Sequence, residues 1–297
     1  MHLRGAGALN TDVRADYRRA REVRKLLADV YSAAPDGAVF LAPGTLVGLR
    51  LVLGAFGVKR VALSAGEYFD ARSFPAARVD LVRAPALAVH LIRYRADAVV
   101  VSIVTWRGER LPVETLFRQL RRRMGAGTPL LVADFSHAGA AGFPRVADCG
   151  ADIVVGDVTK WITPPPAPDR LAYLWFRTAG LRLLAQRVFA PFYLAAVKPG
   201  AALEARWVDP EALAEIAARQ KERRVTRKEL MRRYRADLKL ATRMARWCYA
   251  PAPTSPLVWI RSAAGMARIP DWVSERGLLW RPPGGGARVM CRSDLAP

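Results

Sequence analysis

Apolar residues along this chain gather in short unbroken runs rather than in alternation with polar residues. Strand-like runs of this kind occupy 38–45, 59–64, 97–104, 129–134, 152–156 and 170–176. Unbroken runs are typical of strands that helices cover on both faces, as in parallel sheets. Helical stretches lie between them, among them 46–57 and 111–125. Strands that alternate with helices predict an α/β fold with a mainly parallel sheet.

The pattern changes after about residue 180. A long amphipathic stretch at 210–247 predicts a helical region, and strand-like pieces follow it at 255–262 and 287–293. This mixture indicates a second, smaller unit of α+β type. We therefore predict a large α/β domain over 1–185, with a helical arm over about 1–35, and a small α+β domain over 186–297.

Length and composition exclude several classes of protein. The chain has 297 residues, of which 52% are hydrophobic, so it can bury a large core. No apolar run approaches the roughly 20 residues that cross a bilayer, and the first ten residues lack the apolar segment of a secretory leader. The three cysteines and three histidines are scattered, so we expect no metal site and a reduced, cytoplasmic setting.

The charge is strongly positive, at +21 for the whole chain. Much of it lies at 219–246, a segment that contains 12 Arg or Lys residues but only three acidic residues, Glu222, Glu229 and Asp237. Such a segment is usually a solvated helix face. The sharper alternative is a docking surface for an acidic partner, such as a carrier protein. Nucleic acid is the less favoured partner, and we expect no membrane association.

Candidate chemistry gathers where the predicted strands end. Ligands of open α/β sheets bind outside the carboxyl ends of the strands. The residues at these points are Gly44-Thr45, Glu67 to Asp70, Thr105-Trp106, Asp134, His137 and Thr159 to Trp161. The set includes one lysine, Lys160, in a chain that contains only seven.

These residue types suit pyridoxal phosphate. A lysine can hold the aldehyde as a Schiff base, and a carboxylate can keep the pyridine nitrogen protonated, so that the ring withdraws electrons. A helix N-terminus with Gly-Thr can bind the phosphate. An aromatic side chain can stack on the ring, and an imidazole can hydrogen-bond its phenolic oxygen.

The stretch "LLVADFSHAGAAGFPRVADCGADIVVGDVTKWI" resembles the central signature of the class V aminotransferase family, and "DFSHAGAAG" is nearest to its kynureninase-like branch. "SIVTWRGERLPVETL", "APGTLVGLRLVL" and "GEYFD" resemble further family segments, so the resemblance covers 38–176 well and 250–293 weakly. The family comprises fold-type I pyridoxal phosphate enzymes, including cysteine desulfurases and kynureninase. It implies a seven-stranded-type, mainly parallel sheet with helices on both faces, a small α+β C-terminal domain, and a homodimer.

The resemblance also implies roles for individual residues. Lys160 would form the Schiff base and move the proton at the substrate α-carbon. Asp134 would pair with the pyridine nitrogen, and His137 would contact the phenolic oxygen. The other implied positions are Gly44, Thr45 and Thr159 at the phosphate, Tyr68 (or Phe69) stacked on the ring, Thr105 beside it, and Arg288 (or Arg281) at the substrate carboxylate.

The chain also departs from the family pattern. Asp157 stands where a small polar residue is more usual, and the stretch between Thr45 and Asp134 is short. Cys248 and Cys291 do not occupy the mobile loop that a desulfurase nucleophile needs. We expect aminotransfer on an amino-acid substrate first. A β-elimination or C–C/C–S lyase reaction is the alternative, and a shortened, non-catalytic relative that binds an acidic partner is another.

Overall fold

The computed structural model describes most of the two units that the sequence predicts. The described residues are 19, 21–32, 38–41, 45–64, 78–157, 160, 172–184, 218, 226–282 and 285–297. The predicted boundary between domains, at 185 and 186, lies outside these ranges and stays a prediction.

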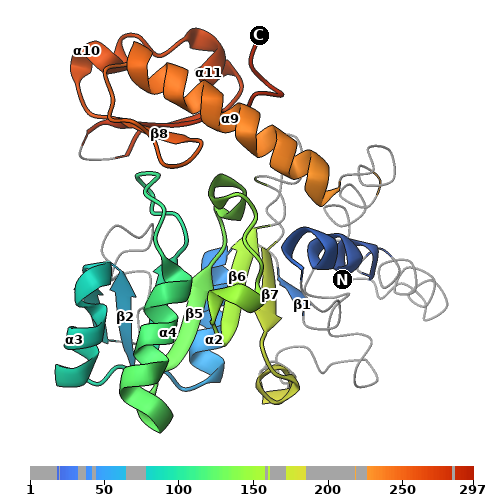
Figure 1. Ribbon diagram of the computed structural model, residues 1–297, viewed down its shortest axis with the longest axis vertical. Helices are drawn as coiled ribbons and strands as arrows, with labels where there is room; N and C mark the ends of the chain where they lie inside the picture. Colours follow the sequence, from blue (N-terminus) through green and yellow to red (C-terminus); the bar gives the residue numbers. More distant parts are fainter. Residues whose placement is uncertain are drawn as a thin grey trace, which may run out of the picture.

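A seven-stranded sheet forms the centre of the larger unit (Figure 1). Its strands are β1 (Ala38–Leu41), β2 (Arg60–Ser64), β3 (Arg78–Val82), β4 (Ala98–Ser102), β5 (Leu130–Asp134), β6 (Ile153–Asp157) and β7 (Ala172–Phe176). The strand order is β1-β7-β6-β5-β4-β2-β3. The strands from β3 to β6 pair in parallel, whereas β7 pairs antiparallel with both β6 and β1. The predicted mainly parallel sheet is therefore confirmed.

Helices cover both faces of this sheet. Helix α2 (Thr45–Ala55) lies behind it in Figure 1, and α3 (Leu87–Arg93) and α4 (Val113–Met124) lie in front. The helix at 21–31 shares the apolar core of α3 and α4, whereas α2 packs in a separate core on the opposite face. Short 3-10 turns complete the larger unit, at Ala84–Ala86, Gly125–Gly127, Ala138–Ala141 and Ala147–Cys149.

Local sequence explains these elements. Every residue of β4, β6 and β7 is buried, as expected of strands covered on both faces. Helix α4 buries Val113, Leu116, Phe117 and Leu120, which recur at the helical period, and its last turn carries three arginines that favour the negative end of the helix dipole. Strand β3 was not predicted, because an edge strand with charged residues lacks an unbroken apolar run.

The smaller unit packs one long helix on a three-stranded antiparallel sheet. Its elements are α9 (Arg227–Trp247), β8 (Leu257–Ile260), α10 (Ala263–Met266), α11 (Asp271–Glu275), β9 (Leu279–Trp280) and β10 (Ala287–Met290). Strand β10 lies between β8 and β9. Helix α9 begins where Thr226 accepts the N–H of Glu229, which satisfies one free donor of its first turn. The sequence predicted α9, β8 and β10, but not the two-residue β9 or the short helices.

A hairpin at 103–111 joins the two units. The N–H of Thr105 donates to the carbonyl of Glu109 at 2.8 Å, and Figure 1 shows the hairpin extending from the sheet toward β8. Gly108 turns its tip with φ +88, where a Cβ would lie 2.6 Å from the carbonyl oxygen of Leu257. Ser255 Oγ donates to the carbonyl of Gly108 at 2.7 Å. The tip is therefore fixed against the smaller unit.

Candidate functional site

Three neighbouring strands, β4, β5 and β6, each end in a polar residue on the same face of the sheet. Successive side chains alternate between the faces of a strand. Val100, Val132 and Val155 pack in the α2 core, so Ser102, Asp134 and Asp157, each two residues further on, face the same side. Ser102 and Asp134 are direct partners in the β4–β5 register. The first residue of α2, Thr45, belongs to the helix that covers this face.

Asp134 is the buried acid of this group, with 4% of its surface exposed. Its Oδ2 accepts the hydroxyl of Ser102 at 3.0 Å. Its Oδ1 accepts the N–H of Ser136 at 2.7 Å and also the hydroxyl of Ser136. Burial raises the pKa of Asp134, although the Ser136 bonds, the charge of Lys160 and the Ser102 bond each oppose the rise. The carboxylate is thus held by neutral donors and one cation.

Lys160 lies beside a second acid, Asp157. The backbone N–H of Lys160 donates to Asp157 Oδ1 at 3.1 Å, and its Nζ lies 3.9 Å from Asp157 Oδ2. The Asp157 side chain is 1% exposed and the Lys160 side chain 22% exposed. Because the charge of Lys160 also lowers the pKa of Asp134, the lysine and both carboxylates belong to one electrostatic cluster.

Arg292, which belongs to the smaller unit, holds the backbone of Lys160 in place. Its Nη1 donates to the backbone carbonyl of Lys160 at 2.8 Å. Its Nε and Nη2 donate to the two carboxylate oxygens of Asp294 at 2.9 and 2.8 Å. The Arg292 side chain has no exposed surface. Sequence reasoning missed this residue, because an arginine near the C-terminus gives no signal in a chain so rich in arginine.

Thr105, His137 and Thr45 reach the same edge of the sheet. Thr105 is 2% exposed, and its Oγ1 accepts the N–H of Glu109 at 3.1 Å. His137 is 8% exposed and precedes the 3-10 turn Ala138–Ala141. Thr45 starts α2, whose first turn contains no acidic residue. All three follow strands that end at this edge, as the sequence predicted for them.

Arg288 lies where the two units meet. It is half-buried on β10, its Nη1 donates to the carbonyl of Trp106 at 3.5 Å, and its guanidinium lies 4.9 Å from the centre of the Trp280 ring. Arg281 is exposed. Arg288 therefore contacts the hairpin that follows β4, and its assignment to the substrate carboxylate, with Arg281 as the alternative, stays a prediction.

Four of the predicted positions lie outside the described residues: Gly44, Tyr68, Phe69 and Thr159. Their assignments to the phosphate and the ring stay predictions. The residues that sequence reasoning missed are Ser102, Ser136 and Arg292. Ser102 had a usable signal, because it is a polar residue within the apolar run 97–104; its pairing with Asp134 comes from the structure.

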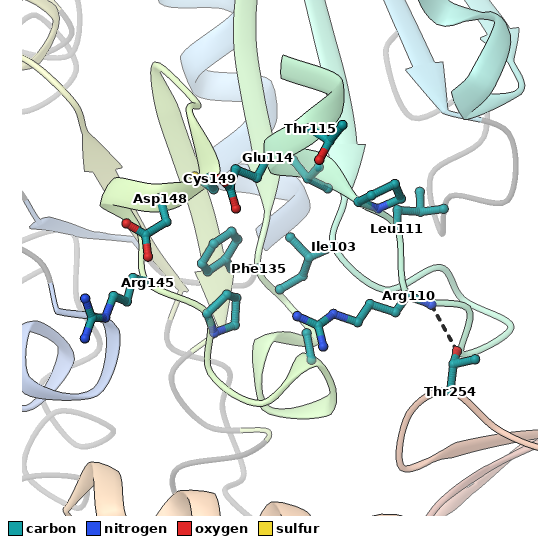
Figure 2. Close-up of a pocket in the computed structure, with 14 residues that line it drawn as sticks. Ile103, Arg110, Leu111, Glu114, Thr115, Phe135, Arg145, Asp148, Cys149 and Thr254 are labelled. Carbon is teal, nitrogen blue, oxygen red and sulfur yellow. Dashed lines mark hydrogen bonds between the residues drawn. The ribbon is translucent and has the colours of Figure 1, made fainter. Parts of the chain in front are cut away.

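A pocket of about 530 Å³ opens on the opposite side of the sheet (Figure 2). Its floor includes Ile103 and Phe135, which pack in the core of α3 and α4 and so face away from Ser102 and Asp134. Figure 2 shows Arg110 extending beneath Ile103, while Arg145 points away. None of the predicted site residues that the structure describes lines this pocket, so it is distinct from the cluster of Asp134, Asp157 and Lys160.

The three cysteines are all buried. Burial raises the pKa of the Cys149 thiol to about 11 and that of Cys291 to about 12, and it also raises the pKa of Cys248. A thiol of this kind is a poor nucleophile at neutral pH. Among the described residues there is no group of three or more potential metal ligands. The described helices include none that is long and apolar enough to cross a membrane.

Comparison with solved structures supports the architecture, whereas comparison of the sequence finds no match. No protein-family model matches the sequence, and no curated protein matches it either. Among solved structures, ureidoglycine–glyoxylate aminotransferase from Bacillus subtilis is similar over 94% of this chain and 81% of its own, with 12% identity and a TM-score of 0.67.

Two structures of C-DES, a cystine C–S lyase, are also similar. The complex with cysteine persulfide covers 97% of this chain and 85% of the lyase, with 17% identity and a TM-score of 0.68. A variant with glycine covalently linked to its pyridoxal phosphate cofactor covers 98% and 84%, with 16% identity and a TM-score of 0.67. At these identities the likeness establishes the fold. The chain therefore has the fold-type I fold of pyridoxal phosphate-dependent transferases, as its resemblance to the class V aminotransferases implied.

Proposed function

We propose that the protein is a pyridoxal phosphate-dependent enzyme that acts at the α-carbon of an amino acid, with aminotransfer as its reaction. The observation that carries this proposal is the cluster of Asp134, Lys160 and Asp157 at the carboxyl edge of the sheet. Ligands of this architecture bind at that edge. A buried acid and a half-buried lysine are the two groups that the cofactor requires.

The described residues fit the cofactor. A buried carboxylate is costly unless donors or a cation compensate it, and a protonated pyridine nitrogen would add such a donor at Asp134. Helix α2 is 11 residues long and has no acid in its first turn, so its N-terminus at Thr45 suits a phosphate. Asp157 is the one unusual member, because its carboxylate pairs with the lysine that the cofactor needs.

Each residue then has a chemical task. When bound, pyridoxal phosphate supplies an aldehyde that joins primary amines and a ring that withdraws electrons. Lys160 would hold the aldehyde and move the proton at the substrate α-carbon. Asp134 would keep the proton on the pyridine nitrogen, and Ser102 and Ser136 hold its carboxylate in place. Arg292 fixes the backbone of Lys160.

The remaining assignments complete the proposed site. His137 would donate to the phenolic oxygen, and Thr105 would lie beside the ring. Arg288 would bind the substrate carboxylate, because a guanidinium matches a carboxylate through two parallel bonds. The phosphate would be held by Gly44, Thr45 and Thr159, with Tyr68 stacked on the ring.

A lyase reaction is the second candidate. It is favoured by the shared architecture with a cystine C–S lyase. A reaction that needs a cysteine nucleophile is opposed by the burial of all three cysteines. Product analysis would separate aminotransfer from elimination. Both can leave a keto acid, but aminotransfer retains the amino group on the cofactor as its amine form, whereas elimination releases the amino group as ammonia.

The proposed assembly is a homodimer with an acidic carrier-type partner. Six exposed basic residues of α9 recur at the helical period and lie along one face: Lys228, Arg232, Arg235, Lys239, Arg243 and Arg246. A row of like charges attracts an acidic surface, and salt screens that attraction. We expect binding of an acidic carrier protein to weaken as the salt concentration rises; binding that does not change with salt would contradict this assignment.

The test of the proposed function is spectroscopic. The purified protein should take up one equivalent of pyridoxal phosphate and show the absorbance of a protonated Schiff base, and Lys160→Ala should abolish that band. Addition of an amino donor should then shift the spectrum. A wild-type protein that takes up no cofactor would refute the proposal.

A further inference from the structure

Three side chains form a row across one face of the small sheet. Arg288 on β10 is opposite Trp259 on β8 and opposite Trp280 on β9. Their strand neighbours Val258 and Val289 pack in the core of the smaller unit. Because side chains alternate between faces, the row lies on the other face, where Leu257 joins the core of the larger unit.

Trp106 from the larger unit packs against the two tryptophans of this row. Its ring centre lies 4.7 Å from that of Trp259 and 5.8 Å from that of Trp280, at interplanar angles of 71° and 88°. Both are edge-to-face arrangements, which aromatic pairs prefer. We call Trp106, Trp259, Trp280 and Arg288 the tryptophan cage. All four residues are half-buried, so the cage keeps aromatic surface that another molecule can reach.

The cage is close in the chain to the candidate site. Trp106 follows Thr105 and stands four residues after Ser102, whose hydroxyl holds Asp134. The hairpin that carries Trp106 continues from the carboxyl end of β4, and the carbonyl of Trp106 accepts from Arg288. The cage therefore lies at the same edge of the sheet as Asp134, on the side of the smaller unit.

The chemistry of the cage selects a ligand class. Three indole rings offer flat apolar surface, and a guanidinium offers paired donors for a carboxylate. Indole rings also attract cations, but two guanidinium groups already lie against them: Arg107 is 5.0 Å from the centre of the Trp106 ring, and Arg288 is 4.9 Å from that of Trp280. A cationic side chain would therefore be repelled by like charges. The indole Nε1 of Trp259 is buried and has no hydrogen-bond acceptor among the residues that the structure describes. Buried donors are normally satisfied, and a ligand oxygen would supply this one.

We propose that the tryptophan cage binds the aromatic side chain of the substrate next to its carboxylate, so that the enzyme acts on an aromatic amino acid. This inference rests on the proposed function for the position of the reacting carbon. The cage itself should bind a carboxylic acid with an aromatic ring more tightly than one without a ring, and this difference in affinity can be measured without the cofactor.

The experiment compares 3-phenylpropionate with propionate as ligands of the cofactor-free protein, by titration calorimetry. In parallel, L-phenylalanine, L-alanine and L-arginine are titrated into the cofactor-loaded protein and followed by absorbance. We expect 3-phenylpropionate to bind at least about tenfold more tightly than propionate, and L-phenylalanine to shift the spectrum at the lowest concentration. Equal binding of the two acids would overturn the inference.

Variants locate the effect. Trp280→Leu and Trp106→Leu should reduce the ratio of the two affinities by about threefold to tenfold, since an aromatic pair contributes that much beyond buried area. Trp272→Leu is the matched control, because Trp272 is a half-buried tryptophan of α11 outside the cage. An unchanged ratio in both cage variants, with thermal unfolding still cooperative, would also overturn the inference.

The two proposals fail in different ways. Cofactor uptake without any preference for the aromatic ligands overturns the cage assignment alone. A preference for 3-phenylpropionate in a protein that takes up no cofactor overturns the proposed function, and it leaves the cage as a site for aromatic carboxylates.

Discussion

Replacement of Asp157 with Asn should make attachment of the cofactor easier. The Nζ of Lys160 lies 3.9 Å from Asp157 Oδ2, and this ion pair favours the charged amine. A Schiff base forms from the neutral amine, so the pair opposes attachment. An asparagine keeps an oxygen that can accept the backbone N–H of Lys160, as Asp157 Oδ1 does at 3.1 Å. The variant therefore removes the charge and preserves the local hydrogen bond.

The magnitude follows from Coulomb's law. Two unit charges about 4 Å apart attract by about 4 kcal/mol at an effective dielectric of about 20, and by about 1 kcal/mol in bulk water. Lys160 keeps 22% of its side chain exposed, which places the interaction between these limits. Since 1.36 kcal/mol corresponds to one pH unit, the pH midpoint for Schiff-base formation should fall by about one to three units in Asp157→Asn.

The assay is an absorbance titration with pyridoxal phosphate between pH 6 and pH 10, read at the Schiff-base band. Asp152→Asn is the matched control. Asp152 is a half-buried acid at the opposite end of β6 from the buried Asp157, and it pairs with Arg121 instead of Lys160. Asp152→Asn should leave the pH midpoint for Schiff-base formation unchanged. Neither variant alters Asp134, the other acid of the cluster. A midpoint that stays the same or rises in Asp157→Asn would refute the reasoning.

Three further variants test other parts of the account. Asp294→Asn leaves the buried Arg292 without its carboxylate and should cost about 2–3 kcal/mol in urea unfolding, less than the 3–5 of fully buried pairs. Burial raises the pKa of Asp294, but its bonds with Arg292 outweigh this effect and hold that pKa below its ordinary value. The difference in unfolding free energy between wild type and Asp294→Asn should therefore persist at neutral pH and shrink below about pH 4. A difference that grows in acid would contradict this assignment. Phe117→Ala in the fully buried core should cost about 3–5 kcal/mol in the same assay, and a loss below 1 kcal/mol would show that Phe117 is not packed as described. Asp134→Asn should slow exchange of the substrate α-proton, followed by NMR in heavy water, by about 10² or more, and an unchanged rate would remove Asp134 from the site.

The sheet could be predicted from the sequence because its strands leave local signals. Asp134 was proposed because it ends an apolar run as a single charged residue, and Lys160 because it is a lone lysine shortly after another such run; the structure brings both into one cluster, and their roles stay predictions. The family resemblance implied a mainly parallel, seven-stranded-type sheet, whereas the order of its strands comes from the structure. Strand β3 escaped this reasoning, because its exposed edge tolerates Arg78 and Asp80 and leaves no apolar run.

The rest of the site depends on contacts between distant parts of the chain. Arg292 reaches the carbonyl of Lys160 across 132 positions, and nothing in its neighbours distinguishes it from the other arginines. The tryptophan cage needs the register of β8, β9 and β10 together with a hairpin more than a hundred residues earlier. Asp157 was visible as a departure from the family pattern, but its pairing with Lys160 required coordinates.

We propose that Lys160 is the residue that carries the cofactor. Borohydride reduction of the protein loaded with pyridoxal phosphate, followed by peptide mapping by mass spectrometry, would identify the lysine to which the cofactor is attached. We expect one reduced pyridoxyl adduct, located on Lys160. An adduct on another lysine, or none in a protein that has been incubated with the cofactor, would contradict it.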